Sequence, residues 1–224
     1  MLLNDDLSVP AVVHAARLDW VASPTRGVDR RMLFRIGEEK ARATSIVRYA
    51  PESRFPHHDH PGGEEFFVLE GTFQDETGDF PAGSYVRNPP GTGHAPGSRE
   101  GCTIFVKLWQ FRRDDRLRIV RRPGEGEKAD PSPGILASTI LFDNGHEQVR
   151  LEEWEPGARI RRDNREGLEL LVLSGAFSDG ENALEAQSWL RLPAGYPLEA
   201  AVGPDGAKAW LKSGPLLPDN VVPF

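Results

Sequence analysis

The chain contains one cysteine, Cys102, among 224 residues, and none of its apolar runs is longer than a β-strand. A single cysteine cannot form an internal disulfide, so we expect a reducing compartment, the cytoplasm. A membrane-spanning helix needs about 20 consecutive apolar residues, so no membrane segment is expected. The chain begins Met-Leu-Leu-Asn-Asp-Asp, with acidic residues where a secretory signal peptide would be basic.

An excess of positive charge is also missing. Lysine and arginine number 27 against 34 aspartate and glutamate residues, which gives a formal net charge of −7. Because phosphate backbones bind basic surfaces, we do not expect direct binding of nucleic acid. The arginine cluster between residues 112 and 122 is interrupted by Asp114 and Asp115. We interpret it as a solvated strand and linker.

Four side chains predict a metal site. His58, His60 and Glu64 stand two and then four positions apart. On an extended strand this spacing places them on one face. His94 ends a segment, 83–94, that is dense in the proline and glycine of turns between short strands. Three imidazoles and one carboxylate suit a first-row transition metal. The alternative, a histidine-rich loop or core histidines that only form hydrogen bonds, does not explain the spacing and the turn residues together.

An internal repeat predicts two similar all-β domains. Residues 65–73 read Glu-Phe-Phe-Val-Leu-Glu-Gly-Thr-Phe, and residues 169–177 read Glu-Leu-Leu-Val-Leu-Ser-Gly-Ala-Phe. Both halves consist of short β runs broken by glycine, proline and aspartate. We expect a metal-binding domain over residues 1–120, a linker over 121–134 and a second domain over 135–224.

The metal ligands do not repeat in the second half. With Gly71 aligned to Gly175, the counterparts of the first three ligands are Arg162, Asn164 and Leu168, and that of His94 falls near Pro197. Leucine and proline cannot ligate a metal, so we expect the second domain to be metal-free. It would then shape the pocket of the first domain, bind another protein, or only cover apolar surface.

The two ligand segments resemble the paired motifs of the cupin superfamily. The first motif is carried by His58, His60, Glu64 and Gly71, and the second by Gly83, Pro89, Gly91 and His94. The resemblance implies two tandem antiparallel β-barrels of the jelly-roll type, with the metal inside the mouth of the first.

A narrower resemblance covers residues 57–108. The runs Pro61-Gly-Gly-Glu-Glu, Arg87-Asn-Pro-Pro-Gly and Gly101-Cys-Thr-Ile-Phe-Val are similar to the cupin domain of ChrR-type anti-sigma factors. That family binds zinc at the four matching positions, which implies a regulatory or sensory role in an oxidative-stress response. The implied partner is an extracytoplasmic-function sigma factor or another regulatory protein.

One departure limits this inference. The sigma-binding module of the family carries its own zinc site with a Cys-x-x-Cys pair, whereas this chain has one cysteine and few residues before the first barrel. Anti-sigma activity is therefore not expected to transfer with the cupin motifs. A homo-oligomer is compatible with the sequence.

The bound ion could do three kinds of work: stabilise a closed zinc site, report a signal to a partner, or perform chemistry at an open position. Zinc is the expected metal, with iron, manganese and nickel as alternatives. The alternative function is a metal-dependent dioxygenase acting on a small diketone or aromatic ketone bound in the first barrel.

Other residues near the motifs have two interpretations each. The following six either line a pocket or form ordinary core: Phe66, Val68, Tyr85, Ile104, Val106 and Trp109. Glu65, Arg87 and Lys107 either orient a substrate or lie on the outer surface of a strand. Cys102 is either redox-active near the metal or a small buried strand residue.

Overall fold

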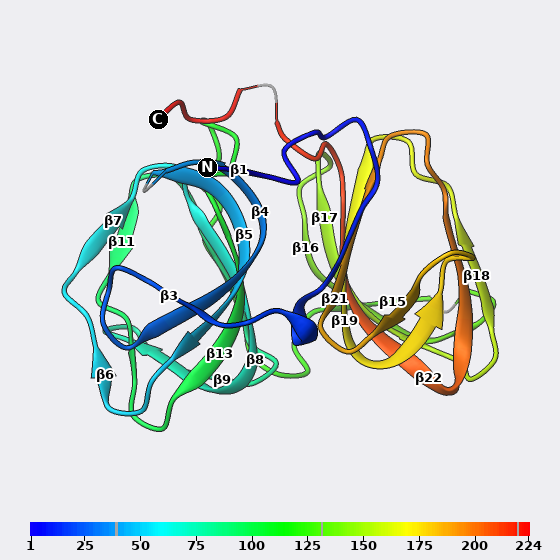
Figure 1. Cartoon of the computed structure of the whole chain (residues 1–224), viewed down its shortest axis with the longest axis horizontal. Helices are drawn as coiled ribbons and strands as arrows, with labels where there is room; N and C mark the ends of the chain where they lie inside the picture. The colour runs from blue at the N-terminus through cyan, green and yellow to red at the C-terminus, as the bar shows by residue number, and fades with distance from the viewer. Residues whose placement is uncertain (39, 131, 219) are drawn as a thin grey trace. The chain divides into compact units, whose positions relative to one another are not determined.

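The protein consists almost entirely of β-strands, as the sequence predicts (Figure 1). The computed structural model describes residues 1–38, 40–130, 132–218 and 220–224. The regular elements in these ranges are strands and one turn of 3-10 helix, η1 (Ala15–Arg17). No helix in the described part of the chain has the length and hydrophobicity needed to cross a membrane.

Two compact units share the chain. Unit 1, which contains the first barrel, comprises Met1–Asp5, Asp19–Gly124 and Leu217–Phe224. Unit 2, which contains the second barrel, comprises Asp6–Leu18 and Glu125–Leu216.

Unit 1 is built around an antiparallel sheet in the order β1–β4–β5–β13–β8–β10–β14. A separate pair, β7 with β11, and the short pairs that β6, β9 and β12 make complete the barrel. Its strands are β1 (Leu2–Leu3), β3 (Val21–Ala22), β4 (Val28–Gly37), β5 (Ala41–Tyr49), β6 (Ser53–Arg54), β7 (His58–His60), β8 (Glu64–Asp75), β9 (Gly78–Pro81), β10 (Tyr85–Asn88), β11 (Thr92–His94), β12 (Gly97–Ser98), β13 (Cys102–Leu108) and β14 (Ile119–Arg121).

Unit 2 has an equivalent sheet in the order β15–β16–β17–β22–β19–β21–β2. The two remaining strands of this unit, β18 and β20, pair with β22 and β19. Its strands are β2 (Ala11–His14), β15 (Glu127–Ala129), β16 (Ile135–Asp143), β17 (Gln148–Trp154), β18 (Arg159–Arg162), β19 (Gly167–Ser178), β20 (Ala183–Glu185), β21 (Ser188–Pro193) and β22 (Leu198–Ser213).

The sequence repeat corresponds to a repeated backbone feature. Gly71 in β8 and Gly175 in β19 have φ angles of 69° and 71°. A Cβ atom at either position would collide with a carbonyl oxygen, that of Gly101 in unit 1 and that of Gly206 in unit 2. Only glycine combines this left-handed conformation with such a close approach. The aligned segments therefore have the same local structure in both units.

The compact units differ from the expected boundaries at both ends of the chain. The N-terminal strand β2 pairs with β21 of unit 2, in the same position that β14 takes beside β10 in unit 1. The expected linker, 121–134, also contributes strand residues, because β14 ends at Arg121 and β15 spans Glu127–Ala129. The edge strands β2 and β15 of unit 2 lie outside the repeated segments, so alignment of the two halves did not predict them.

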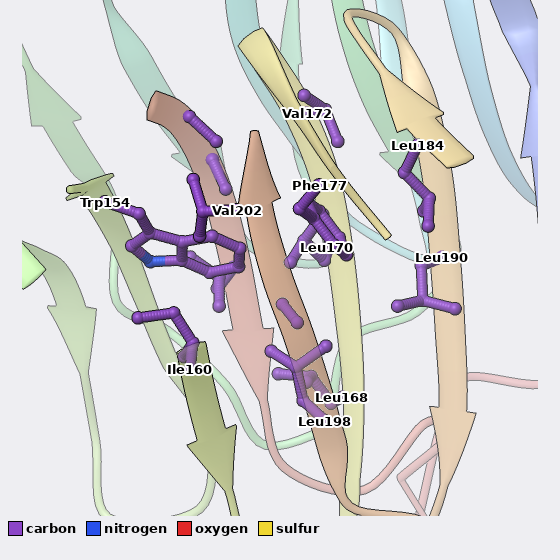
Figure 2. Close-up of a cluster of buried hydrophobic side chains, with 14 of the residues drawn as sticks. Trp154, Ile160, Leu168, Leu170, Val172, Phe177, Leu184, Leu190, Leu198 and Val202 are labelled. Atoms are coloured by element: carbon purple, nitrogen blue, oxygen red, sulfur yellow. The ribbon is translucent and has the colours of Figure 1, made fainter. Parts of the chain in front are cut away.

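The interior of unit 2 is filled by apolar side chains. Figure 2 shows Trp154, Ile160, Leu168 and Leu198 projecting into one cluster from different strands. Trp154 is 1% exposed, and its ring centroid lies 5.2 Å from that of Phe177. Burial of large apolar side chains contributes about 1.5–3 kcal/mol each. This packing stabilises unit 2 through hydrophobic contact.

Candidate metal centre

The antiparallel pair of β7 and β11 positions the three histidines. In its register His94 lies opposite His58, and Thr92 lies opposite His60. Directly opposed residues of an antiparallel pair project to the same side, as do residues two apart along one strand. The three imidazoles therefore share a face, and their ring centroids lie 4.8–5.3 Å apart.

Glycine allows these two strands to approach closely. A Cβ atom at Gly93 would lie 2.6 Å from the carbonyl oxygen of His58 and 2.7 Å from Oδ1 of Asp59. Any larger residue would have to push β11 away from β7. The glycine between Thr92 and His94 thus helps to set the distance between the histidines of the two strands.

Glu64 reaches the same point from the start of β8. The N–H of Gly63 donates to the carbonyl oxygen of His60 at 3.1 Å, which closes a tight turn just before Glu64. Oε2 of Glu64 then lies 3.6 Å from Nε2 of His60 and 3.5 Å from Nε2 of His94. One ligand atom from each of the three histidines lies within 4.8 Å of the others. The structure brings the four predicted side chains together, and we refer to them as the metal cluster.

The metal cluster is mostly buried but has one accessible side. Glu64, His60 and His94 are only 5%, 8% and 4% exposed, whereas His58 is exposed. Among the described residues, the histidines of this cluster form the one group of three or more histidine, cysteine or acidic side chains that is spaced to hold a metal.

Hydrogen bonds at the far side of two rings fix their orientation. Nδ1 of His94 lies 3.2 Å from Oδ2 of Asp75, and Nδ1 of His58 lies 3.3 Å from the carbonyl oxygen of Pro56. A carboxylate and a carbonyl only accept hydrogen bonds, so each Nδ1 carries the proton in these contacts. The remaining nitrogen, Nε2, is then left with a lone pair. Metal-ligating histidines are oriented in this way by their outer partners.

Sequence analysis did not identify Asp75, and a β-bulge explains why. Asp75 and Glu64 are eleven positions apart, so a regular strand would point them to opposite faces. The pairing of β8 with β13 shifts register where Ile104 pairs with Val68 but Thr103 pairs with Glu70. Leu69 is the extra residue, and it restores Asp75 to the face of Glu64. No sequence pattern marked that shift.

The electrostatics of the cluster favour a neutral His60. Burial lowers the pKa of His60, and the charge of Glu64 only partly opposes this. Burial acts in the same direction on His94, but the hydrogen bond to Asp75 and the charge of Glu64 outweigh it and raise the pKa of His94. The Asp75 carboxyl has a lowered pKa, since hydrogen bonds from His94 and Thr77 outweigh its burial.

One buried atom tests whether a metal fits. Nε2 of His60 is buried and has no hydrogen-bond partner among the residues that the structure describes. Its near neighbour is the carboxylate of Glu64, at a distance of 3.6 Å. An unsatisfied buried nitrogen is costly, and a cation between these donors would remove that cost. Nitrogen and carboxylate donors suit zinc, iron, manganese and nickel, so the residues present fit a divalent metal.

A cavity of about 570 Å³ adjoins the metal cluster inside unit 1. Three of the predicted pocket residues line it: Ile104, Val106 and Trp109. Phe66 and Val68 instead pack in the hydrophobic core. The hydroxyl of Tyr85 donates to Glu65, on the opposite face of the sheet from Phe66.

The three charged neighbours of the ligands are buried, so the expectation of an exposed outer face was wrong for them. Glu65, Arg87 and Lys107 are only 1–2% exposed, and none of them lines the cavity. Arg87 donates to Asp115 at 2.7 Å, and Nζ of Lys107 lies 3.2 Å from the Thr44 hydroxyl. Buried charges are normally paired in this way. A substrate-orienting role for these residues has no support in their position.

Cys102 has the environment of a structural cysteine. It is 5% exposed and belongs to the hydrophobic core cluster of unit 1. Burial raises the pKa of Cys102 to about 11, although a hydrogen bond with Ser98 opposes the effect. The thiolate is the reactive form of cysteine, so this thiol is held in its unreactive form near neutral pH.

In unit 2 other interactions occupy the counterpart positions. Nη2 of Arg162 donates to Glu152 at 2.7 Å, and Leu168 is part of the apolar core. The side-chain amide of Asn164 donates to carbonyl oxygens at the end of β21, and its Oδ1 accepts from the N–H of Gly167 at 2.9 Å. Leu198, paired with Arg162 in β18, is fully buried among apolar side chains. These side chains hold the barrel together at the place where unit 1 has its metal cluster.

Comparison with known families supports the interpretation of the first barrel. A family model described as the ChrR Cupin-like domain matches residues 8–112 of the chain. This is slightly less than half of the sequence and includes all four residues of the metal cluster. No curated protein matches the chain.

Several solved structures are similar over nearly the whole chain. A Nostoc punctiforme protein named as a "putative dioxygenase" is 15% identical, with a TM-score of 0.76 over 97% of this chain and 87% of that one. The Escherichia coli pirin YhhW, solved in complex with nickel(II), is 13% identical with a TM-score of 0.68, covering 93% and 100% of the two chains. Bacillus subtilis oxalate decarboxylase, which has Mn(II) centres, is 13% identical with a TM-score of 0.63 over 92% and 77%. At these identities the similarity shows the fold.

Proposed function

We propose that the first barrel of this chain, which a ChrR Cupin-like family model matches, binds one divalent metal ion through His58, His60, Glu64 and His94. The observation that carries this proposal is the convergence of three histidine rings and the Glu64 carboxylate on one point, where the buried Nε2 of His60 has no hydrogen-bond partner among the described residues. A bound ion of this kind would supply a Lewis-acidic centre at the edge of the cavity.

The residues of the chain prepare this site in distinct ways. The β7–β11 pair holds two ligand segments in register, and Asp75 and the Pro56 carbonyl orient the rings of His94 and His58. Glu64 contributes the negative charge that offsets part of the charge of a divalent ion. The exposure of His58 leaves one side of the cluster open to small molecules.

For the biological role, we propose a zinc-loaded regulatory or sensory protein of the ChrR type, linked to oxidative stress and acting in the cytoplasm. The family model supports this proposal, because it matches the barrel that contains the metal cluster. Such a role requires a protein partner, a sigma factor or another regulator. Affinity capture from the native host tests it: specific recovery of a sigma factor or transcription regulator is expected, and recovery of none would contradict the regulatory role.

The cavity favours a second candidate function, a metal-dependent dioxygenase that acts on a small diketone or aromatic ketone. A cavity of about 570 Å³ next to the metal cluster has the size of a small-molecule site. The name of the Nostoc punctiforme protein points in the same direction. Oxygen consumption by the iron-loaded protein with a panel of such ketones tests this function, and its absence across the panel would argue against it.

Metal content is the first measurement for either function. The full-length protein, purified without a chelating tag, is analysed by inductively coupled plasma mass spectrometry beside His94→Ala and the control His146→Ala. His146 is exposed in unit 2, outside the metal cluster. We expect one equivalent of metal in wild type and in His146→Ala, and loss of it in His94→Ala. Zinc would favour the regulatory function, and iron, manganese or nickel would favour the dioxygenase.

A further inference from the structure

Two arginines line the cavity beside the metal cluster. Arg30 and Arg35 both project from β4 into the cavity that His58, His60 and Glu64 also line. They are opposite Val47 and Ala43 of β5, which are themselves cavity residues. Arg35 is only 7% exposed. A buried guanidinium at the wall of an internal cavity is unusual, because desolvation of a cation is costly.

A β-bulge brings both arginines to the same side of the sheet. Arg30 and Arg35 are five positions apart, so a regular strand would direct them to opposite faces. The pairing of β4 with β5 shifts between Met32 and Phe34, which makes Leu33 the extra residue. Burial lowers the pKa of Arg35, the positive charge of Arg30 adds to this effect, and the charge of Glu38 opposes it. The two guanidiniums are therefore within electrostatic reach of each other.

Among the described residues, neither guanidinium has a carboxylate within ion-pair distance, although the charge of Glu38, whose exposed side chain pairs with the N-terminal amine, partly offsets that of Arg35. Nε of Arg30 is buried without a hydrogen-bond partner. Nη2 of Arg35 donates to the backbone carbonyl of Glu38, which carries no charge. The two carboxylates that line the cavity are engaged elsewhere: Glu64 lies with the histidines of the metal cluster, and Asp59 lies 4.0 Å from His57. Among the described residues that line the cavity, no carboxylate therefore pairs with either guanidinium.

The rest of the wall is largely apolar. Its hydrophobic side chains include Val47, Ile104, Val106, Leu108 and Trp109. Such a wall suits a hydrocarbon or aromatic group, and a paired guanidinium suits a planar anion that accepts two parallel hydrogen bonds.

We propose that the cavity of unit 1 binds a small organic carboxylate, whose carboxylate group is held by Arg30 and Arg35 and whose apolar body packs against the wall next to the metal cluster. This inference deepens the proposed function, because it names the class of ligand or substrate that the metal site would meet. Carboxylate is favoured over phosphate because a planar anion matches a guanidinium fork, and an attached apolar body suits the hydrophobic side chains of the wall.

The first test needs only the wild-type protein. Isothermal titration calorimetry compares phenylacetate and isovalerate with the neutral phenylacetamide and with phenylphosphonate. We expect a carboxylate to bind about 10-fold or more tightly than phenylacetamide, since a charge-assisted pair contributes of that order. Equal affinity for acid and amide, no measurable binding of either carboxylate, or a preference for the phosphonate would overturn the proposal.

Variants then locate the binding groups. Arg35→Met and Arg30→Met keep the length of the side chain and remove its charge. The control is Arg48→Met, because Arg48 is 47% exposed on β5 and pairs with Asp29 outside the cavity. Each cavity variant should lower the affinity for phenylacetate about 10-fold, and the control should not. Circular dichroism melts check that each variant is folded. Unchanged affinity in both folded cavity variants would overturn the proposal.

The same samples separate this inference from the proposed function. Metal content is measured on each variant, and Arg35→Met should retain the metal while it loses carboxylate affinity. His94→Ala should lose the metal while it keeps the preference for phenylacetate over phenylacetamide. A wild-type protein that discriminates acid from amide but contains no metal would refute the metal centre and leave the carboxylate site standing. A metal-loaded protein that does not discriminate acid from amide would refute the carboxylate site and leave the metal centre standing.

Discussion

Oδ2 of Asp75 lies 3.2 Å from Nδ1 of His94, while Nε2 of the same ring lies 3.5 Å from Glu64 at the centre of the metal cluster. The side chain of Asp75 is 2% exposed, so this contact is shielded from water. A buried carboxylate behind a ligating imidazole fixes its tautomer and raises the basicity of the nitrogen that faces the metal. Asp75 would therefore act on a metal bound at this cluster through His94, without itself being a ligand.

Asp75→Asn should weaken metal binding about 10- to 100-fold, the range found when such an outer partner is removed. The substitution keeps the shape and an acceptor oxygen for Thr77, but it loses the negative charge that favours His94. Competition with a chelator of known affinity measures the change. The control is Asp79→Asn, since Asp79 is exposed and bonds to Gln74 in the same hairpin. Equal metal affinity in wild type and Asp75→Asn would show that the contact has no such role.

Gly93→Ala should weaken metal binding although it changes no ligand. The added methyl would lie 2.6 Å from the carbonyl oxygen of His58, so β7 and β11 would have to separate. Gly91→Ala is the matched control: its Cβ meets nothing within 4 Å, although its φ of 86° costs about 1 kcal/mol. Chelator competition and thermal melts of both variants provide the comparison. If Gly91→Ala impaired metal binding as much as Gly93→Ala, the close approach would not be what positions the histidines.

The sequence was sufficient to predict the all-β class and to select four residues that the structure brings together. The spacing of His58, His60 and Glu64 works as a signal because the alternation of a strand is regular over that distance. Asp75 and Arg35 could not be found in the same way. Each lies beyond a bulge, at Leu69 or at Leu33, and one inserted residue reverses the faces of everything that follows. The predicted residues therefore lie where strand alternation is regular, whereas the missed residues lie beyond a bulge that interrupts it.

The burial of two charged residues also could not be predicted from the sequence. Glu65 and Lys107 alternate with core residues, which in a half-exposed sheet would place them in solvent. They are instead 2% exposed, and they face each other across β8 and β13. Alternation identifies the two faces of a strand but does not indicate whether the second face is covered. Only the tertiary structure supplies that information.

Unit 2 contains a buried ionic group that should be critical for its stability. Glu152 is completely buried, and it accepts hydrogen bonds from Arg162 at 2.7 Å and from Nε1 of Trp154 at 2.9 Å. Arg150 adds a third contact at 3.3 Å. Glu152→Gln should lower the free energy of unfolding by about 3 kcal/mol, because it leaves two partly buried guanidiniums without their counter-ion.

Urea denaturation of Glu152→Gln and Glu153→Gln tests this prediction. Glu153 is the neighbouring residue on β17, and its ion pair with Lys208 is about half exposed, so its replacement should cost less than about 1 kcal/mol. The metal content should be unaffected in both variants, since all four residues of the metal cluster belong to unit 1. Equal destabilisation by the two substitutions would contradict a special role for the buried group.

Cys102 should make the stability of the protein fall at alkaline pH. Burial raises its pKa from 9.0 to about 11, so the unfolded chain releases the thiol proton before the folded chain does. Between these two pKa values the unfolded state binds fewer protons, and the free energy of unfolding decreases by up to about 1.4 kcal/mol per pH unit. Below pH 9 the thiol is neutral in both states and contributes no pH dependence.

Cys102→Ala isolates this effect from the other groups that titrate at high pH. We expect the stabilities of wild type and Cys102→Ala to differ by a constant amount below about pH 9, and the wild type to lose stability relative to the variant as the pH rises toward 11. Denaturant titrations at several pH values measure the difference. Reaction with a thiol reagent at pH 8 provides a second check, because the folded protein should react far more slowly than the unfolded chain. A difference between the two proteins that stayed constant up to pH 11, together with rapid labelling of the folded protein, would mean that the thiol is not buried as the structure places it.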